Sequence, residues 1–114
     1  MYYTYMVRCN DGTLYTGYTT NIERRLFEHN ESAKGAKYTR ARRPVKLTYF
    51  EEFTTRSEAC KREAQIKKMK RHEKEQLINK YQNDKKVEKN SYWQIFIHNL
   101  YYKIVIITII FLIR

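Results

Sequence analysis

Two short segments of alternating side chains flank an Asn-Asp-Gly tripeptide at residues 10–12 and restrict the start of the chain to a β-hairpin. Residues 2–8 alternate with period two, and residues 13–19 are rich in threonine and tyrosine, which favour strands. The tripeptide is the predicted turn between the two strands.

The length of this turn decides where two tyrosines lie. A two-residue loop would place Tyr5 and Tyr15 on opposite faces of the sheet, because a one-residue shift inverts every side chain. A three-residue loop at residues 10–12 would pair Val7 with Tyr15 and put both tyrosines on one face. Gly12 can adopt the left-handed conformation that a type I turn with a bulge requires. We therefore predict the three-residue loop.

A helix should follow the hairpin. Thr20 and Glu23 have the spacing of a capping box, which predicts a helix from Asn21 to about His29. Its buried stripe would contain Ile22 and Leu26. Arg25 and His29 are four residues apart on the adjacent stripe, so both should project toward the edge of the sheet that carries the tyrosines.

The middle of the chain predicts a loop and a third strand. Residues 30–43 are polar and basic without apolar periodicity, which indicates a loop. Alternation returns at Val45–Phe53, directly after Pro44, and predicts a strand. The expected fold is α/β (α+β), with a three-stranded, mainly antiparallel sheet flanked by helices.

A second capping box at Thr55 and Glu58 predicts another helix. Glu63 would lie on or beside the buried stripe of that helix, although a carboxylate is costly to bury. It is a candidate site residue, or else a salt-bridge partner of Lys67 at i+4. Residues 73–81 predict a further short helix.

The composition changes after residue 82. We expect a domain at 1–82, a polar linker at 83–92 and an apolar tail at 93–114. The tail approaches the length of a membrane span but contains His98, Asn99 and Lys103. Three interpretations are open: weak membrane association with Trp93, Tyr101 and Tyr102 near the headgroups, an element packed on the domain, or a non-native extension.

Charge predicts the class of partner. The 114 residues contain 23 Lys and Arg against 12 Asp and Glu, and Lys103 and Arg114 are the only charged residues after residue 90. Such a surface favours a polyanion, and seventeen aromatic side chains offer stacking platforms for bases. Two widely spaced cysteines and the absence of a secretory signal favour the cytoplasm. The expected partner is nucleic acid.

Several short motifs, taken together and in order, resemble the GIY-YIG nuclease domain over residues 1–82. They are Tyr3-Thr4-Tyr5, Tyr15-Thr16-Gly17, Arg25, His29, Lys37-Tyr38-Thr39-Arg40, Arg43-Pro44-Val45 and Lys61-Arg62-Glu63. The similarity is greatest to the small stand-alone bacterial, excinuclease-like members. The chain departs from the name-giving pattern where Tyr3-Thr4 replaces Gly-Ile and Thr16 replaces Ile, at positions that pack or turn.

The resemblance implies metal-dependent endonuclease activity in DNA processing or repair. Tyr5 would be the general base assisted by Tyr15, Arg25 would hold the scissile phosphate, and His29 would relay a proton or orient water. Glu63 would ligate Mg²⁺ or Mn²⁺, and Gly17 would be structural. One carboxylate suffices, because Mg²⁺ fills its octahedron with water and substrate oxygens.

The basic loop supplies the expected backbone contacts to the substrate, from Lys34, Lys37 and Arg40, with Tyr38 as a stacking residue. Each site residue also has an ordinary structural role: tyrosines pack in sheets, and Arg25 and His29 could form a solvated helix face. The competing function is a nucleic-acid-binding module with the same fold that does not cleave or needs a partner. Composition leaves the oligomeric state open.

Overall fold

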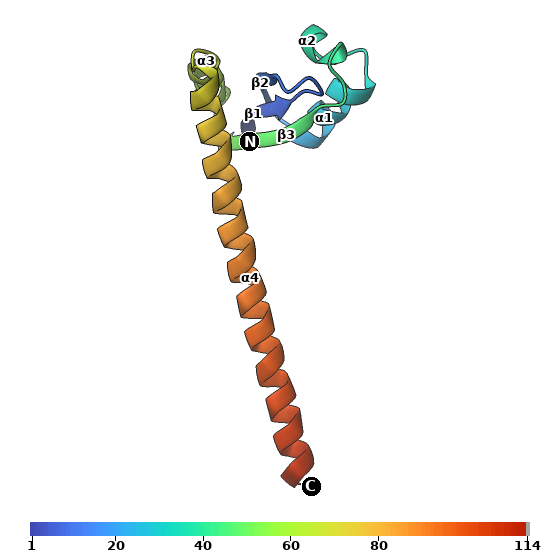
Figure 1. Cartoon of the computed structure of the whole chain (residues 1–114), viewed down its shortest axis with the longest axis vertical. Helices are drawn as coiled ribbons and strands as arrows, with labels where there is room; N and C mark the ends of the chain where they lie inside the picture. The colour runs from blue at the N-terminus through green and yellow to red at the C-terminus, as the bar shows by residue number, and fades with distance from the viewer. Residues whose placement is uncertain (114) are drawn as a thin grey trace. The chain divides into compact units, whose positions relative to one another are not determined.

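Three antiparallel strands form one sheet, β1 (Tyr2–Arg8), β2 (Leu14–Thr19) and β3 (Lys46–Phe53), in the order β2-β1-β3 (Figure 1). The computed structural model describes the chain from Met1 to Ile113, apart from the side chains of residues 87 and 89–93. The predicted α/β class and antiparallel sheet are confirmed.

The hairpin has the predicted three-residue loop. Val7 pairs with Tyr15, and Gly12 has a φ of 83°. The backbone amide of Cys9 donates to the Thr13 carbonyl at 2.8 Å, closing the loop. Since side chains alternate along a strand, this register puts Tyr5 and Tyr15 on the same face, as predicted.

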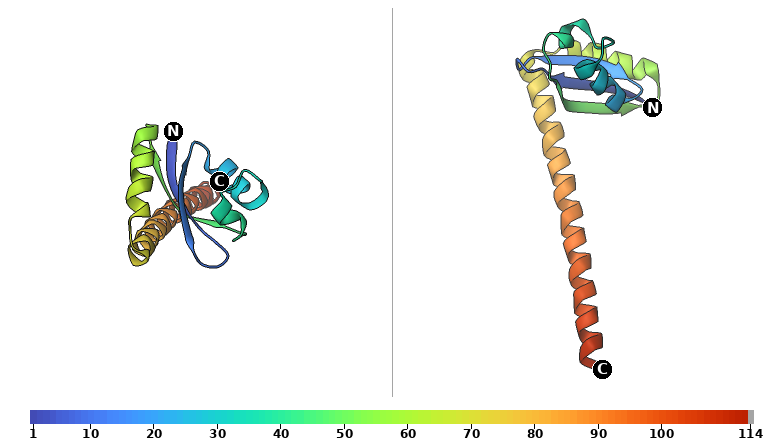
Figure 2. Two further views of the ribbon diagram at one scale, coloured as in Figure 1. Left: turned by 90° about the horizontal axis from the view of Figure 1, so that it is seen from above. Right: turned by 90° about the vertical axis from the view of Figure 1, so that its right-hand side faces the viewer.

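Helices cover both faces of the sheet (Figure 2). Helix α1 (Ile22–Glu31) and the short α2 (Lys37–Arg40) lie on the face that carries Tyr5, where Leu26 packs against the buried core of Tyr5 and Val7. Helix α3 (Arg56–Lys67) covers the opposite face, and its Ala59 carbonyl accepts a hydrogen bond from buried Thr4 at 2.7 Å. The site residues of β1 are thereby enclosed by α1.

Two local predictions need correction. The cap of α1 is Asn21, not Thr20, and its side chain accepts from the Arg24 amide, so the helix begins one residue later and runs to Glu31. The segment 30–43 is not entirely loop, because residues 37–40 form α2. The predicted cap of α3 is confirmed: the Thr55 side chain accepts from the Glu58 amide.

Helix α4 (Arg71–Ile113) contributes to both compact units of the chain, Met1–Asn79 and Lys80–Arg114. Its first turns belong to the first unit, where Ile78 is buried and Glu75 pairs with Arg8 at 2.8 Å. The segment 83–92, predicted as a polar linker, is helical. Its lysines and glutamate suit a helix as well as a linker, and no glycine or proline interrupts it.

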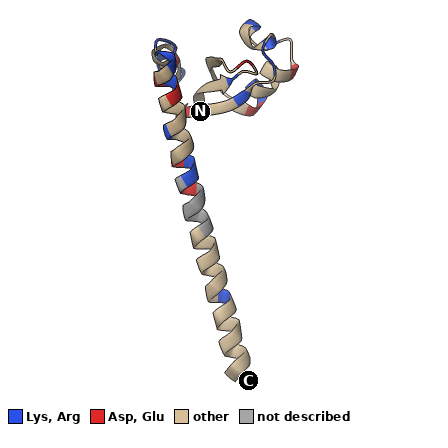
Figure 3. Cartoon of the chain, viewed as in Figure 1, with Lys and Arg blue, Asp and Glu red and all other residues tan. Residues whose placement is uncertain are grey.

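The second unit contains a long apolar stretch. Gln94–Ile113 is helical, twenty residues long and apolar enough to cross a membrane, with none of its side chains buried. Lys103 is its only charged residue (Figure 3).

Candidate active site

A short hydrogen bond between a tyrosine and a histidine forms the centre of the site. Tyr5 Oη lies 2.6 Å from His29 Nε2, and the two residues are only 3% and 0% exposed. Strand β1 supplies Tyr5, and the last turn of α1 supplies His29. The Tyr15 ring meets the His29 ring edge to face at 5.2 Å between centroids. The structure thus brings together three of the residues selected from the sequence.

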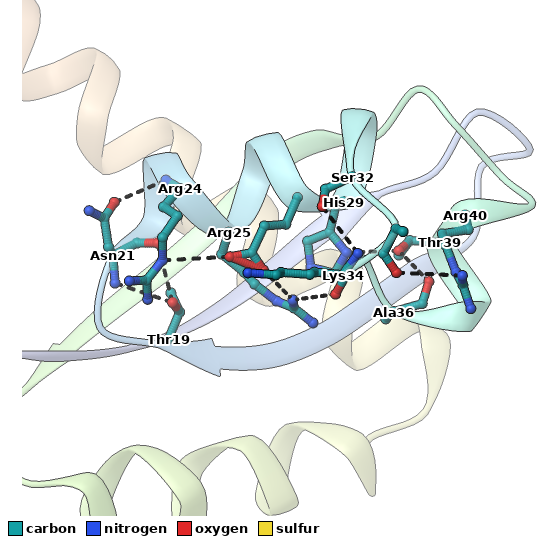
Figure 4. A network of polar contacts seen from close by, with 12 residues as sticks. Thr19, Asn21, Arg24, Arg25, His29, Ser32, Lys34, Ala36, Thr39 and Arg40 are labelled. Atoms are coloured by element: carbon teal, nitrogen blue, oxygen red, sulfur yellow. Dashed lines mark hydrogen bonds and ion pairs between the residues drawn. The ribbon is translucent and has the colours of Figure 1, made fainter.

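Arg25 extends this cluster toward solvent. Its Nε donates to Tyr5 Oη at 3.4 Å, and its Nη1 donates to Glu28 at 2.9 Å. The same Nη1 donates to the Lys34 carbonyl at 3.0 Å (Figure 4). The Arg25 side chain is 24% exposed. Within residues 1–113, apart from the undescribed side chains, Arg25 Nη2 has no hydrogen-bond partner. That nitrogen can donate to a phosphate oxygen while Nε keeps its contact with the phenol.

Burial sets the protonation states of the pair. It raises the pKa of Tyr5 to about 12, although the nearby Arg25 guanidinium acts in the opposite direction. It lowers the pKa of His29 to about 4, and repulsion from Arg25 and Arg43 contributes to the same shift. At neutral pH the pair therefore consists of a phenol and a neutral imidazole.

Gly17 leaves the space that the Tyr5 phenol occupies. It pairs with Tyr5 across β1 and β2. A Cβ atom at residue 17 would lie 2.7 Å from Tyr5 Oη and 2.9 Å from Tyr5 Cζ. The ring cannot easily move away, because its hydroxyl is bonded to His29 and Arg25.

We expect Gly17→Ala to lower the free energy of unfolding by about 1–3 kcal/mol, as overpacking of a filled core does. Urea titration followed by circular dichroism measures the change. In a Tyr5→Phe background the same substitution should cost less, because the oxygen nearest to the new methyl group is gone. An equal loss of unfolding free energy in the wild-type and Tyr5→Phe backgrounds would contradict a close contact between residue 17 and the Tyr5 hydroxyl.

Aromatic rings and cations form the exposed edge of the site. Tyr15 and Tyr38 stack at 6.2 Å between centroids with 22° between their planes, and the Arg42 guanidinium lies 3.8 Å above the Tyr38 ring. A shallow pocket at the β2 edge is lined by Leu14, Tyr15, Thr16, Tyr38, Lys67 and Lys74. Lys34, Lys37, Tyr38 and Arg40, the predicted substrate-binding residues, are all exposed.

Glu63, the predicted metal ligand, lies on α3 with a side chain that is 16% exposed. Its Oε1 is 2.6 Å from Lys67 Nζ, so the i+4 ion pair considered from the sequence is present. Lys67 also lines the pocket beside Tyr15. Burial is the main cause of the raised pKa of Tyr5, and the Glu63 carboxylate adds to it.

The donor set suits a magnesium site with one protein carboxylate. Among the described residues there is no group of three or more His, Cys, Asp and Glu side chains that could hold a metal. Mg²⁺ commonly takes only one or two protein carboxylates. Glu63 is partly buried and already attracts a cation, Lys67, at 2.6 Å. A divalent ion at Glu63 would compete with this ammonium group.

Sequence reasoning missed three contributions to the site. Thr39 Oγ1 lies 2.7 Å from His29 Nδ1, although its segment has no apolar periodicity that would have indicated a contact. Arg43 donates to the His29 carbonyl at 2.6 Å and to the Ser32 carbonyl at 2.5 Å, which anchors the end of α1. Lys74 lines the pocket from α4. Thr39 and Arg43 belong to two of the short motifs that carry the family resemblance, whereas Lys74 gave no signal beyond its basic character.

The sheet, its flanking helices and the cluster of Tyr5, Arg25 and His29 are those of a small nuclease-like domain. The chain belongs to the GIY-YIG family: the model of the GIY-YIG catalytic domain matches residues 1–82. Membership indicates a nuclease-like function.

Relatives and a solved structure support the same assignment. The chain is 60% identical over 76 residues to a UPF0213 protein of Syntrophus aciditrophicus, covering 67% of this chain and 87% of that protein. It is 54% identical over 77 residues to the UPF0213 protein SSP2268 of Staphylococcus saprophyticus, covering 68% and 93%. The solution NMR structure of the protein EF2693 from E. faecalis matches with a TM-score of 0.50 and 52% identity, over 71% of this chain and 85% of that one.

Proposed function

We propose that residues 1–82 form a divalent-metal-dependent endonuclease that cleaves DNA phosphodiesters in DNA processing or repair. The observation that carries this proposal is the hydrogen-bonded series from the partly exposed Arg25 to Tyr5 and from Tyr5 to His29. It combines a phosphate anchor, a candidate general base and a proton acceptor in one network. The formal net charge of +11 favours a polyanionic substrate through counterion release.

Proton transfer in this site would proceed from water through Tyr5 to His29. The phenol, with a pKa of about 12, is protonated at neutral pH and cannot accept a proton while it keeps its own. His29 Nε2, 2.6 Å away, can take the phenolic proton as Tyr5 Oη takes one from the attacking water. The resulting hydroxide oxygen forms the new bond to phosphorus, and the bond to the leaving oxygen breaks. Arg25 would stabilise the charge that develops on the phosphate.

Glu63 would hold Mg²⁺ or Mn²⁺ at this site. When bound, such an ion polarises a phosphoryl oxygen and stabilises charge on the leaving group. Lys67 would then release the Glu63 carboxylate and become available to the substrate backbone. The remaining backbone contacts would come from Lys34, Lys37 and Arg40, and Tyr38 would stack on a base.

The low exposure of the reacting groups favours a second candidate, a GIY-YIG module that binds nucleic acid without cleaving it alone. His29 is fully buried and Tyr5 is 3% exposed, so water reaches the phenol only if the surrounding side chains move. A partner or the substrate could supply that movement.

One assay separates the two functions. The full chain is incubated with labelled duplex, branched and single-stranded DNA and with RNA, in the presence of Mg²⁺, Mn²⁺ or a chelator. Metal-dependent cleavage of at least one DNA substrate is expected of the enzyme. Binding without cleavage of any substrate would reject the enzyme and leave the binding module.

We also propose that Gln94–Ile113 associates with a lipid bilayer. From Ile104 to Ile113 only Thr108 has a polar side chain, so this end of the helix has no polar face to turn toward water. Twenty residues span about 30 Å, the thickness of a hydrocarbon core. The Thr108 hydroxyl donates to the Ile104 carbonyl at 2.9 Å, so it brings no unpaired donor into lipid. If only the last turns of the helix insert, the headgroups would lie near Tyr101, Tyr102 and Lys103. The predicted headgroup contact of Trp93 concerns a side chain outside the described residues.

The full chain should therefore float with neutral phosphatidylcholine vesicles in a density gradient, whereas a chain that ends at Gln82 should remain at the bottom. Neutral lipid is used because the basic domain would bind anionic vesicles by charge alone. Circular dichroism of the truncated chain checks that the domain is folded. A full chain that stays in the bottom fraction would reject membrane association.

A further inference from the structure

We propose that Thr39 is a positioning residue that fixes the tautomer of His29, with the proton on Nδ1 and the lone pair of Nε2 aimed at Tyr5. The effect of this tautomer on catalysis rests on the proposed nuclease function. The assignment of the tautomer is independent of that function.

The phenol of Tyr5 has one acceptor. Among the described residues its oxygen has two polar neighbours within hydrogen-bond distance, Arg25 Nε at 3.4 Å and His29 Nε2 at 2.6 Å. A guanidinium has only donors, so the phenolic hydrogen must go to His29 Nε2. That nitrogen therefore carries a lone pair.

The neutral ring must then carry its proton on Nδ1. Nδ1 lies 2.7 Å from Thr39 Oγ1, which is within hydrogen-bond distance. The hydroxyl of Thr39 has its own acceptor, the Ala36 carbonyl, at 3.0 Å. Every hydrogen in the series Tyr5, His29, Thr39 and Ala36 thus has an acceptor, with all donors oriented in one direction.

The opposite orientation leaves one hydrogen unpaired. If Thr39 donated to Nδ1, the Nε2 hydrogen would point at Tyr5 Oη, which already receives Arg25 Nε–H. The phenolic hydrogen would then be buried without an acceptor among the described residues. Such a loss typically costs about 1–3 kcal/mol, or roughly a 5-fold to 150-fold preference for the first orientation.

The fold places Thr39 for this role. Ala36 precedes the first residue of α2, and its carbonyl also accepts the backbone amides of Thr39 at 3.1 Å and Arg40 at 3.0 Å. The helix is short, yet Thr39 is fully buried against His29 (Figure 4). The position of α2 therefore determines which imidazole nitrogen faces the phenol.

The tautomer can be measured by ¹⁵N NMR of the imidazole nitrogens, in the full chain solubilised in detergent micelles at neutral pH. His29 is assigned among the three histidines by its absence from a His29→Gln variant. We expect wild-type His29 to show a protonated Nδ1 and an unprotonated Nε2. In Thr39→Val the two tautomers should become comparable, because each now leaves one hydrogen unpaired. Thr39→Ser should restore the wild-type spectrum.

A matched control removes another buried hydroxyl. Thr4 is fully buried and donates to the Ala59 carbonyl, away from His29, so Thr4→Val should leave the His29 tautomer unchanged. Protonation of Nε2 in the wild type would overturn the proposal, as would a Thr39→Val spectrum identical to the wild type. If the wild type does not cleave any nucleic acid, the proposed function fails while the tautomer measurement still stands.

If cleavage is present, Thr39→Val should lower kcat by about 10-fold to 100-fold, the loss seen when the orienting partner of a metal-ligating histidine is removed. Thr39→Ser should recover most of the rate. Equal losses in Thr39→Ser and Thr39→Val would contradict the role of the hydroxyl.

Discussion

Glu63→Gln should lower the rate of metal-dependent cleavage by about 10²-fold to 10⁴-fold while the domain stays folded. The amide keeps the size of the carboxylate but removes its charge, so the site loses its candidate ligand for the divalent ion. An ion that stabilises transition-state charge contributes several kcal/mol, and each 1.4 kcal/mol is a factor of ten in rate. Single-turnover cleavage across a Mg²⁺ titration measures the loss.

Glu58→Gln is the matched control, because Glu58 lies in the first turn of the same helix and is exposed. This variant should cleave at the wild-type rate with the same Mg²⁺ dependence. Its melting temperature should also match that of Glu63→Gln within a few degrees, since Lys67, the ion-pair partner of Glu63, is 53% exposed and such an i,i+4 pair contributes little. A Glu63→Gln variant with the wild-type Mg²⁺ dependence would reject Glu63 as the ligand.

Tyr5→Phe should reduce cleavage by about 10²-fold to 10⁴-fold, the usual contribution of a general base. It should also lower the free energy of unfolding by about 1–3 kcal/mol, because the buried Nε2 lone pair of His29 loses its donor. Cleavage rates and urea titration of the same samples give the two effects.

Tyr49→Phe controls for the loss of a buried phenol. Tyr49 is 5% exposed, and burial raises the pKa of its phenol to about 12, as for Tyr5. It pairs with Met6 and so lies on the opposite face of the sheet, where it donates to Glu51. Tyr49→Phe should cost stability without loss of cleavage. An equal loss of cleavage in both variants would show that Tyr5 acts only through stability.

The hairpin register could be predicted because it depends on local chemistry. The Asn-Asp-Gly turn admits two loop lengths, and Gly12 with its φ of 83° selects the one that aligns Val7 with Tyr15. That register alone puts Tyr5 and Tyr15 on one face. The position of Arg25 and His29 follows from their spacing of one helical turn on α1.

Contacts that depend on the path of a polar segment could not be predicted. Residues 30–43 have no apolar periodicity, so nothing local indicated that Thr39 would be buried against His29. The predicted start of α1 differs from the observed start by one residue, because Thr20 and Asn21 are both residues that cap helices well. Only the backbone geometry distinguishes the two. Residues 83–92 contain neither glycine nor proline, and the helix that they form agrees with the propensity of their lysines and glutamate.

The hydrogen-bonded series that begins at Tyr5 ends on the carbonyl of Ala36, which has no proton to pass on. The series can therefore accept one proton, on His29, but cannot pass it to solvent at the Ala36 end. A proton taken by His29 has to leave by the route it entered, through the phenol. The same group that activates the attacking water would thus be restored when the proton returns, so each turnover would reset the site without exchange through the interior of the domain.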